Sequence, residues 1–350
     1  MSTQFYSDAF AGNGSLARAL TNLGLIESLA GKHLLLTGGT GFFGRWLLAL
    51  LGHLNKQGAG IEVTVTSRNP SAFLSANPDY SNCNWMHWLP GDIRELRSVP
   101  GRPLSLILHA ATDTSAEANS NPLELFDTIV LGARRIYDIA VRNEGVRVLV
   151  TGSGAQYGNI ADLGAVPETY SGACISNDVS SVYGEAKRVQ ETLGSIYAEY
   201  RGVDVVMARC FAFSGFGLPL NGHFAIGNFV RDAVYSDEVL LTSGGTAVRS
   251  YLHGADLALW LLTLLVRGQG GKAYNVGSDE AITIADLARR VVDRVAPDKR
   301  VRILGRSESS ARSHYVPDIT CARELGLDVW TSLDESIDSM VHWARLHSCV

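Results

Sequence analysis

Short apolar runs rich in leucine and β-branched residues alternate with longer amphipathic segments along most of the chain. Five runs predict strands, at residues 33–37, 61–67, 105–110, 146–152 and 203–209. Segments with apolar residues at helical spacing lie between them, at residues 42–56, 122–143 and 183–201. Alternation of strands and helices favours a parallel sheet with helices on its faces. The pattern predicts an α/β fold built on a Rossmann-like, doubly wound parallel sheet.

The pattern changes at both ends of the chain. Leu16, Leu20, Leu23 and Ile26 recur at helical spacing, so a capping helix is expected in the first thirty residues. Beyond residue 210 the alternation loosens, and a helix near 283–295 with a strand near 300–304 predicts a smaller lobe over the carboxyl edge of the sheet. Three parts are expected: an N-terminal helical extension (1–30), a dinucleotide-binding Rossmann domain (31–209 with 246–277) and a smaller C-terminal α/β substrate lobe (210–245 with 278–350).

Charge and cysteine content narrow the classes of function. The chain has 30 basic and 35 acidic residues without long single-sign runs, which argues against nucleic acid as a partner. Its five cysteines are scattered and form no CxxC pair, so neither a disulfide framework nor a metal site is expected. No signal peptide is evident, and apolar stretches such as Leu257–Val266 fall short of the ~20 residues that cross a bilayer. A cytoplasmic protein with a small-molecule partner and no membrane partner is therefore expected.

The strongest local signal is a glycine-rich turn between the first predicted strand and the helix after it. Gly38, Gly41 and Gly44 give the spacing GxxGxxG. Glycines let the backbone turn tightly and approach a pyrophosphate, and the helix that follows offers unpaired amides to the phosphates. An ordinary glycine-rich turn is the alternative, but the flanking strand and helix favour a bound dinucleotide.

Two more segments, with this turn, carry a resemblance to a known family. Tyr183 and Lys187 form a YxxxK pair one helical turn apart, and Ser153 lies in a segment similar to SSxxxYG. In order and spacing these elements resemble the extended short-chain dehydrogenase/reductase family, in its nucleotide-sugar-modifying epimerase/dehydratase branch. Further matches extend over almost the whole chain: Gly91-Asp92-Ile93, His109-Ala110-Ala111, Arg209 with Gly215 and Gly217, Arg249 with Asp256-Leu257-Ala258, Tyr274-Asn275-Val276-Gly277, and Pro317-Asp318.

The resemblance implies an NAD(P)-dependent enzyme in which Ser153, Tyr183 and Lys187 are catalytic. Tyr183 would exchange a proton with a substrate oxygen that Ser153 also hydrogen-bonds, while hydride passes between a sugar carbon and the nicotinamide. A phenol has a solution pKa of about 10, so Lys187 is needed beside it as a cation and should also hold the nicotinamide ribose. The resemblance further implies a homodimer through the helices at 122–143 and 183–201, whose apolar faces could equally cover the sheet.

The end of the second predicted strand bears on the cofactor. It has no acidic residue to bind a ribose 2′-hydroxyl, whereas Ser67 and Arg68 can bind a 2′-phosphate, which favours NADP. The alternative is that Arg68 is a solvated loop cation and the cofactor is NAD. Asp92 and Ile93 resemble the family's adenine-contacting pair. The expected cofactor contacts are Gly38, Thr40, Gly41, Phe42, Phe43, Gly44, Ser67, Arg68, Asp92, Ile93, Ala110, Ala111, Tyr183 and Lys187.

The two positions after Ser153 bear on the reaction. In the nucleotide-sugar 4,6-dehydratases of this family they carry groups that move protons at C5 and C6, but here they are Gly154 and Ala155, and neither can act as an acid or base. Dehydration by that route is not expected. Reduction of a nucleotide-linked 4-keto-6-deoxyhexose is favoured by the NADP-type site. The alternatives are a 4-epimerase that retains NAD and a non-catalytic, redox-sensing dinucleotide-binding protein.

The expected substrate contacts are Thr112, Ser153, Gly154, Ala155, Arg249 and Arg306. Arg249 stands where family members bind the nucleotide diphosphate, and Arg306 lies near a second such position. The alternative for Arg306, equally favoured, is a solvated cation on a surface loop. Ile129 and Ala212 replace asparagines that are usual in the family, which changes the substrate contacts expected around them.

Overall fold

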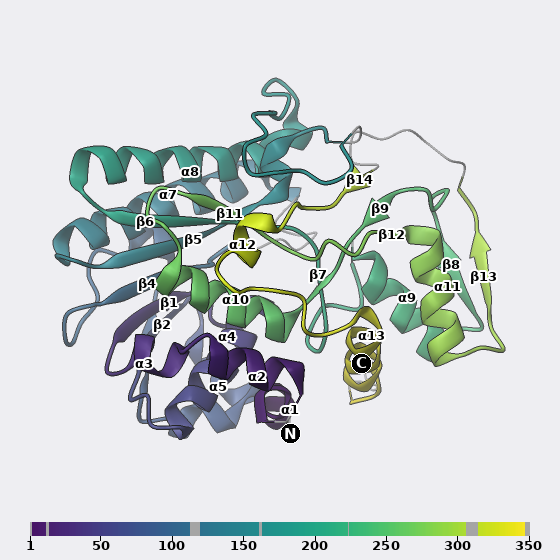
Figure 1. Ribbon diagram of the computed structural model, residues 1–350, viewed down its shortest axis with the longest axis horizontal. Helices are drawn as coiled ribbons and strands as arrows, with labels where there is room; N and C mark the ends of the chain where they lie inside the picture. The colour runs from purple at the N-terminus through teal and green to yellow at the C-terminus, as the bar shows by residue number, and fades with distance from the viewer. Residues whose placement is uncertain are drawn as a thin grey trace.

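A seven-stranded parallel sheet forms the centre of the computed structural model, which describes residues 2–11, 14–112, 120–160, 163–222, 224–305 and 314–346 (Figure 1). The strand order is β11-β6-β5-β4-β1-β2-β3, and all neighbours run parallel. The strands are β1 (His33–Thr37), β2 (Glu62–Ser67), β3 (Met86–Pro90), β4 (Leu106–His109), β5 (Arg147–Ser153), β6 (Asp204–Cys210) and β11 (Ala273–Val276). The order reverses between β1 and β4, where ligands bind in doubly wound sheets. The predicted fold class is confirmed.

Helices cover both faces of this sheet. On one face lie α7 (Pro122–Arg142) and α8 (Val182–Arg201), and on the other lie α4 (Phe42–Lys56) and α10 (Gly254–Arg267) (Figure 1). The short α5 (Pro70–Ala76) follows β2. The sequence pattern did not predict α10, because this helix is buried on all sides, by α4, α1, α3 and the sheet, and therefore has no polar face.

The N-terminal residues form three helices and not the single capping helix that the leucine spacing predicts. They are α1 (Ser2–Ala11), α2 (Ser15–Asn22) and α3 (Leu25–Leu29). That prediction is wrong because Gly24, with φ of 56°, adopts the left-handed conformation and breaks the apolar stripe between Leu23 and Ile26. In α1, the ring of Tyr6 packs edge-on against Trp46 of α4, with 4.7 Å between centroids. The extension is therefore part of the main core.

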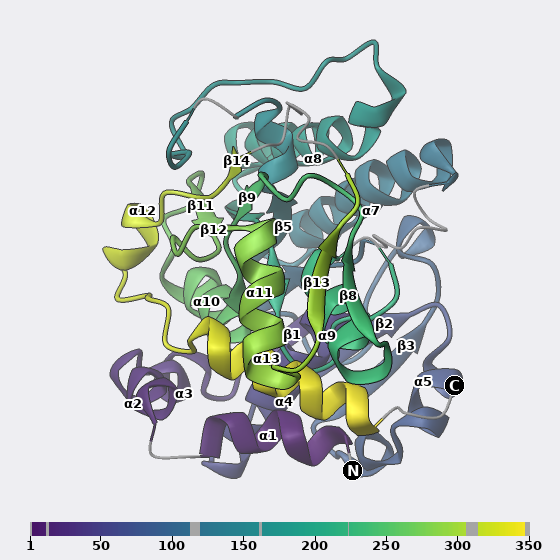
Figure 2. The ribbon, with the colours of Figure 1, turned by 90° about the vertical axis from the view of Figure 1, so that its right-hand side faces the viewer.

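A second, smaller hydrophobic core lies beyond the carboxyl ends of the strands (Figure 2). Its elements are α9 (Ala225–Tyr235), α11 (Ile284–Val295), α13 (Leu333–Leu346) and the paired strands β8 (Glu238–Leu241) and β13 (Arg300–Ile303). Short strands connect it to the main sheet: β7 (Phe213–Ser214) with β10 (Leu252–His253), and β9 (Val248–Arg249) between β12 (Ile282–Thr283) and β14 (His314–Tyr315). The remaining helix, α12 (Thr320–Arg323), lies near β11. These connections bring segments from the last third of the chain to the carboxyl edge of the sheet.

Candidate active site

Three glycines shape the turn between β1 and α4. Gly38 has a φ of +73°, and a Cβ there would lie 2.4 Å from the carbonyl oxygen of Ala110. A Cβ on Gly44 would lie 2.3 Å from backbone atoms of Gly39, so its absence lets the helix pack close to the turn. Gly41 is exposed and begins α4 without a side-chain cap. The first amides of α4 thus have no side-chain acceptor, an arrangement suited to a pyrophosphate.

The other expected contacts of this turn, Thr40, Phe42 and Phe43, are half-buried. The carbonyl oxygen of Thr40 accepts a hydrogen bond from Arg45 Nε at 3.3 Å. The ring of Phe43 packs edge-on against Phe213 with 4.9 Å between centroids. Phe42 contacts both hydrophobic cores.

The ends of β2 and β3 lie side by side, because Ser67 pairs with Pro90 in register. Both oxygens of the Asp92 carboxylate accept hydrogen bonds from Arg94, at 2.7–2.9 Å. These bonds hold the pKa of Asp92 below its usual range, and the charge of the exposed Arg68 lowers it further. The structure therefore brings Arg68 and Asp92 together at the edge where the adenosine end of a dinucleotide would lie.

Ile93, expected to contact adenine together with Asp92, has a buried side chain. It is 7% exposed, and its Cγ2 lies against Gly132 of α7, 3.0 Å from the position of a Cβ on that glycine. Its side chain thus belongs to the core under α7. Only backbone atoms of Ile93 remain available to a ligand.

Ser153 and Lys187 come from two elements that pack together at the carboxyl edge. Ser153 ends β5, and its Oγ accepts the N–H of Ala155 at 3.1 Å. The ammonium of Lys187, buried in α8, donates to Thr112 Oγ1 at 2.9 Å and to the carbonyl oxygen of Thr151 at 2.6 Å. Thr112, expected to contact substrate, is thus a partner of the lysine.

The third donor position of Lys187 is occupied by Gln190, which the sequence reasoning missed. Its Oε1 accepts from Lys187 Nζ at 3.2 Å, and the glutamine is 1% exposed. The three acceptors are neutral, and burial lowers the pKa of Lys187 to about 8. The spacing of three residues on one helix is the signal that could have indicated this pair.

Tyr183 lies one turn before Lys187 on α8 and is half-buried. Its ring packs against a small apolar cluster that contains Leu125 and Ile129 of α7 and Ala186 of α8. Ile129, at a position where the family usually has asparagine, is therefore part of the wall beneath the tyrosine ring. The structure places Ser153, Tyr183 and Lys187 at one edge of the sheet, but their catalytic role stays a prediction.

His109 joins the two strands at which the sheet order reverses. Its Nδ1 lies 2.8 Å from Thr37 Oγ1, which also accepts the amides of Ala110 and Ala111 at 3.1 and 3.2 Å. Burial and, to a smaller extent, the charge of Lys187 lower the pKa of His109 to about 3. His109 is therefore neutral at physiological pH, and the loop with Ala110 and Ala111 is fixed against β1.

A second buried histidine gives a pH prediction. Burial lowers the pKa of His253 to about 4, whereas an unfolded histidine titrates near 6.5. The unfolded state then binds the proton more tightly, so stability is complete above pH 6.5 and falls as the pH decreases towards 4. At pH 5 the protein's free energy of unfolding should therefore be lower than at pH 7 by about 2 kcal/mol for each of His109 and His253. We expect His253→Asn to reduce the loss between pH 7 and pH 5 by about that amount in urea titrations; an unchanged loss would contradict the assignment.

A buried polar network lies behind Ser153. Arg209 pairs with the carboxylate of Glu191 and donates to Tyr157 Oη at 2.8 Å. Tyr157 Oη donates to Asn275 Oδ1 at 2.7 Å, and Gln156 Nε2 donates to Glu191 Oε2. Burial raises the pKa of Tyr157 to about 12, which keeps the phenol protonated. Arg209 and Asn275, noted in the sequence as family matches, thus tie β6 and β11 to α8.

The substrate side of the site faces the smaller lobe. Arg249 lies on β9, with its guanidinium 5.8 Å from the ring centroid of Tyr315 on β14. Gly154 and Ala155 are buried in the turn after Ser153. Ala212 contacts the core of the smaller lobe. Arg306 lies outside the described residues.

Within the ranges given above, no helix has both the length and the apolar character needed to cross a membrane. In the same part of the chain, no three histidine, cysteine, aspartate or glutamate side chains are grouped as metal ligands.

Three features define a dinucleotide-binding α/β protein of the doubly wound class: the strand order of the sheet, the glycine-rich turn after β1 and the site at the carboxyl edge. The family model for the NAD dependent epimerase/dehydratase family matches residues 34–277. The chain belongs to this family, which confirms the resemblance and the expectation of a nicotinamide dinucleotide cofactor.

Similar proteins agree with this membership. UDP-glucuronic acid decarboxylase 6 of Arabidopsis thaliana is 28% identical over 320 residues, 89% of each chain. The structure of UDP-glucose 4-epimerase from Thermotoga maritima with UDP-glucose has 20% identity and a TM-score of 0.75, covering 91% of this chain and 100% of that one. The structure of RMD from Pseudomonas aeruginosa with NADPH has 19% identity and a TM-score of 0.72, covering 90% and 99%. At these identities the two structures show a shared fold.

Proposed function

We propose that this protein is an NADPH-dependent reductase of a nucleotide-linked 4-keto-6-deoxyhexose. The observation that carries the proposal is the composition of the turn after β5. Ser153 is followed by Gly154 and Ala155, so the turn offers a hydroxyl to the reacting oxygen but no acid or base beside it. Hydride transfer at C4 needs only Ser153, Tyr183, Lys187 and the cofactor, whereas elimination of water also needs a base for the C5 proton.

The described residues suit a bound dinucleotide. The uncapped start of α4 would hold the pyrophosphate, and Ser67 with Arg68 would hold an adenosine 2′-phosphate. When bound, NADPH supplies the hydride. Tyr183 Oη then gives its proton to the C4 oxygen as the carbonyl becomes a hydroxyl, and solvent returns a proton to the phenolate. Ser153 Oγ hydrogen-bonds the same oxygen, and the positive charge of Lys187 would stabilise the phenolate that forms.

The nucleotide sugar would lie between this edge and the smaller lobe. Arg249 would bind the diphosphate with its planar guanidinium. Two relatives are named for reactions on UDP-sugars, UDP-glucuronic acid decarboxylase and UDP-glucose 4-epimerase, which supports a nucleotide sugar as the substrate class. The turn after β5 argues against dehydration, and Ser67 with Arg68 favours reduction over epimerisation because these two residues suit NADPH.

The test compares substrates under one set of conditions. With dTDP-4-keto-6-deoxyglucose and NADPH we expect one nicotinamide oxidised per 4-hydroxy sugar formed, followed by nicotinamide absorbance and mass spectrometry. A mass-neutral product from UDP-glucose without net nicotinamide change would indicate an epimerase. Loss of water from dTDP-glucose would indicate a dehydratase, and loss of carbon dioxide from UDP-glucuronic acid a decarboxylase. Any of these three results without keto-sugar reduction would overturn the proposal.

The cofactor preference gives a separate prediction. We expect Arg68→Ala to weaken NADPH binding at least about tenfold and to leave NADH binding almost unchanged, because only NADPH carries the 2′-phosphate. Fluorescence titration with both cofactors measures the two dissociation constants. Arg97→Ala is the control, since Arg97 is also exposed but lies beyond the second 3-10 helix, Ile93–Glu95. Equal weakening of NADPH and NADH would assign Arg68 to the solvated loop.

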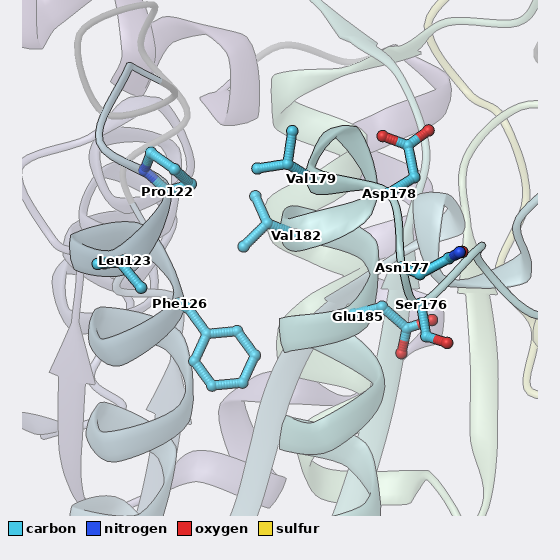
Figure 3. Close-up of a pocket in the computed structure, with 9 residues that line it drawn as sticks. All are labelled: Pro122, Leu123, Phe126, Ser176, Asn177, Asp178, Val179, Val182 and Glu185. Carbon is cyan, nitrogen blue, oxygen red and sulfur yellow. The ribbon is translucent and has the colours of Figure 1, made fainter.

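We further propose that α7 and α8 form the contact of a homodimer. Leu123 of α7 is 80% exposed and Val179, just before α8, is 72% exposed. Figure 3 shows both side chains at a groove of about 500 Å³ that Phe126 and Val182 also line. More apolar side chains are exposed along the two helices, at Leu131, Val141, Ile196 and Tyr200. A second copy of the same surface would remove this apolar area from water.

Sedimentation velocity tests this contact. We expect Leu123→Asp to shift the protein from dimer to monomer, because a carboxylate at the centre of an apolar contact is desolvated without a partner. Leu240→Asp is the control, since Leu240 is also partly exposed but lies on β8 of the smaller lobe. A wild-type monomer, or dissociation of both variants, would contradict the proposed contact.

A further inference from the structure

A glutamine side chain completes the hydrogen bonds of the Lys187 ammonium. Gln190 lies on α8 as the lysine does, and its Oε1 accepts from Lys187 Nζ at 3.2 Å. Its Nε2 donates at 3.1 Å to the carbonyl oxygen of Thr151, which also accepts from Lys187 Nζ at 2.6 Å. The carbonyl oxygen of Gln190 accepts from Tyr137 Oη of α7 at 3.1 Å. Both the glutamine and the lysine are buried, so these bonds hold the ammonium in one place.

Neutral groups face this ammonium in the described part of the chain. Its three acceptors are the hydroxyl of Thr112, a backbone carbonyl and the amide of Gln190. From the sheet, burial lowers the pKa of His109 on β4 to about 3 and raises the pKa of Cys210 on β6 to about 12. On α7, burial also raises the pKa of Tyr137, so all three titratable groups are uncharged at neutral pH.

The carboxylate that follows in the chain is bound elsewhere. Glu191 comes directly after Gln190 on α8, but it pairs with Arg209 of β6 and accepts from Gln156 Nε2. The amide of Gln190 therefore accepts a hydrogen bond from the ammonium without forming an ion pair. In a site of low dielectric, a cation without a counter-charge acts more strongly on its other neighbours than a cation in an ion pair.

We propose that Gln190 is a positioning residue that fixes the Lys187 ammonium and leaves its charge uncompensated. The charge is then available to the phenolate that forms on Tyr183 during proton transfer. In this role Gln190 acts through the lysine and not by contact with the sugar. The inference rests on the roles of Lys187 and Tyr183 in the proposed function.

The alternative is that Gln190 only satisfies a buried N–H group. Two substitutions separate the roles. Gln190→Glu keeps the shape and an acceptor oxygen but places a carboxylate beside the ammonium, whereas Gln190→Met is neutral, similar in length and has no amide. A purely structural role affects the stability of either variant but leaves the turnover of the folded enzyme close to wild type.

Urea titrations between pH 7 and pH 10 measure the charge compensation without any substrate. Burial lowers the pKa of Lys187 to about 8, whereas an unfolded lysine titrates at about 10.4. The unfolded state therefore keeps the proton longer, and this group makes the free energy of unfolding rise as the pH increases from about 8 to about 10. An added carboxylate stabilises the ammonium, so the rise should be smaller in Gln190→Glu than in wild type. Gln190→Met adds no charge and should keep the full rise.

Steady-state kinetics with the keto sugar and NADPH at pH 7 test the positioning. We expect both variants to lose about tenfold in kcat, while KM for the sugar changes less than about threefold. Gln190→Glu compensates the charge, and Gln190→Met leaves the ammonium unfixed. Ser195→Glu is the matched control, because it adds a carboxylate to the exposed face of the same helix and should keep wild-type kcat. If Gln190→Glu does not fold, Gln190→Met still carries this test.

The two measurements fail separately. An equal rise of the free energy of unfolding in wild type and Gln190→Glu would overturn the assigned effect of Gln190 on the lysine charge. Folded variants that both keep kcat within about threefold of wild type would overturn the positioning role and leave Gln190 a structural residue. Wild-type protein that does not reduce the keto sugar would overturn the proposed function itself, while the urea titrations would still decide whether Gln190 governs the charge of Lys187.

Discussion

Replacement of Tyr183 by phenylalanine is expected to lower turnover at least about a hundredfold, because the variant lacks the proton that general acid catalysis delivers to the sugar oxygen. The ring packs against the apolar cluster around Ile129, and phenylalanine keeps this contact. Folding and cofactor affinity should therefore stay close to wild type. Steady-state kinetics with the keto sugar, beside a cofactor titration and thermal unfolding, measure the three quantities.

Tyr197→Phe is the matched control for this variant. Tyr197 lies on the same helix, but its hydroxyl donates to Asp138 of α7 and not towards the carboxyl edge of the sheet. Its removal should leave turnover within about twofold of wild type, since no reacting atom is touched. If Tyr183→Phe also kept wild-type turnover, Tyr183 would not be the proton donor, and the reaction would require another acid.

The second large effect concerns the glycine turn. Gly44→Ala should abolish detectable dinucleotide binding and lower the free energy of unfolding by about 3 kcal/mol, as overpacking does in a filled core. The new Cβ would lie 2.3 Å from Cα and C of Gly39 and 2.4 Å from the carbonyl oxygen of Gly38. These are backbone atoms, so the clash can only be relieved if α4 moves away from the turn. Cofactor titration and urea unfolding measure both effects.

Gly52→Ala on the same helix separates this clash from the general effect of a methyl group. A Cβ at Gly52 would lie 3.4 Å from Cζ2 of Trp85, which is ordinary contact. Alanine is also a better helix former than glycine by about 1 kcal/mol. Cofactor binding should therefore be unchanged and stability equal or higher. Wild-type cofactor binding by Gly44→Ala would show that the turn does not need its close packing to bind the dinucleotide.

The pattern of the sequence located most of the sheet because its signals are local. Strands such as His33–Thr37 and Arg147–Ser153 are short apolar runs bounded by turn residues, and α4 was expected at 42–56, as the structure has it. The pattern failed for α10, because a helix buried on every side has no polar stripe. At the N-terminus the leucine spacing continued past Gly24, although the backbone leaves the right-handed helical conformation there.

Candidate site residues could likewise be predicted where the parts of a motif follow one another along the chain. The glycine turn and the YxxxK pair are contiguous motifs, and their spacing places their backbone and side chains without knowledge of other segments. The hydrogen-bond partners of these groups could not be predicted in the same way, because they lie on other elements. That Lys187 donates to Thr112 depends on how α8 packs against the loop after β4.

By itself the sequence determined the fold class, the family and the composition of the turn after Ser153. Tertiary structure alone decided what surrounds that turn: Tyr315 and Phe211 fill the volume beside Gly154, and Arg249 lies beside Tyr315. Periodicity reports which face of an element is apolar, but it carries no information on which distant element covers that face. Contacts between residues far apart in the chain depend on the packing of both hydrophobic cores, which only the folded chain establishes.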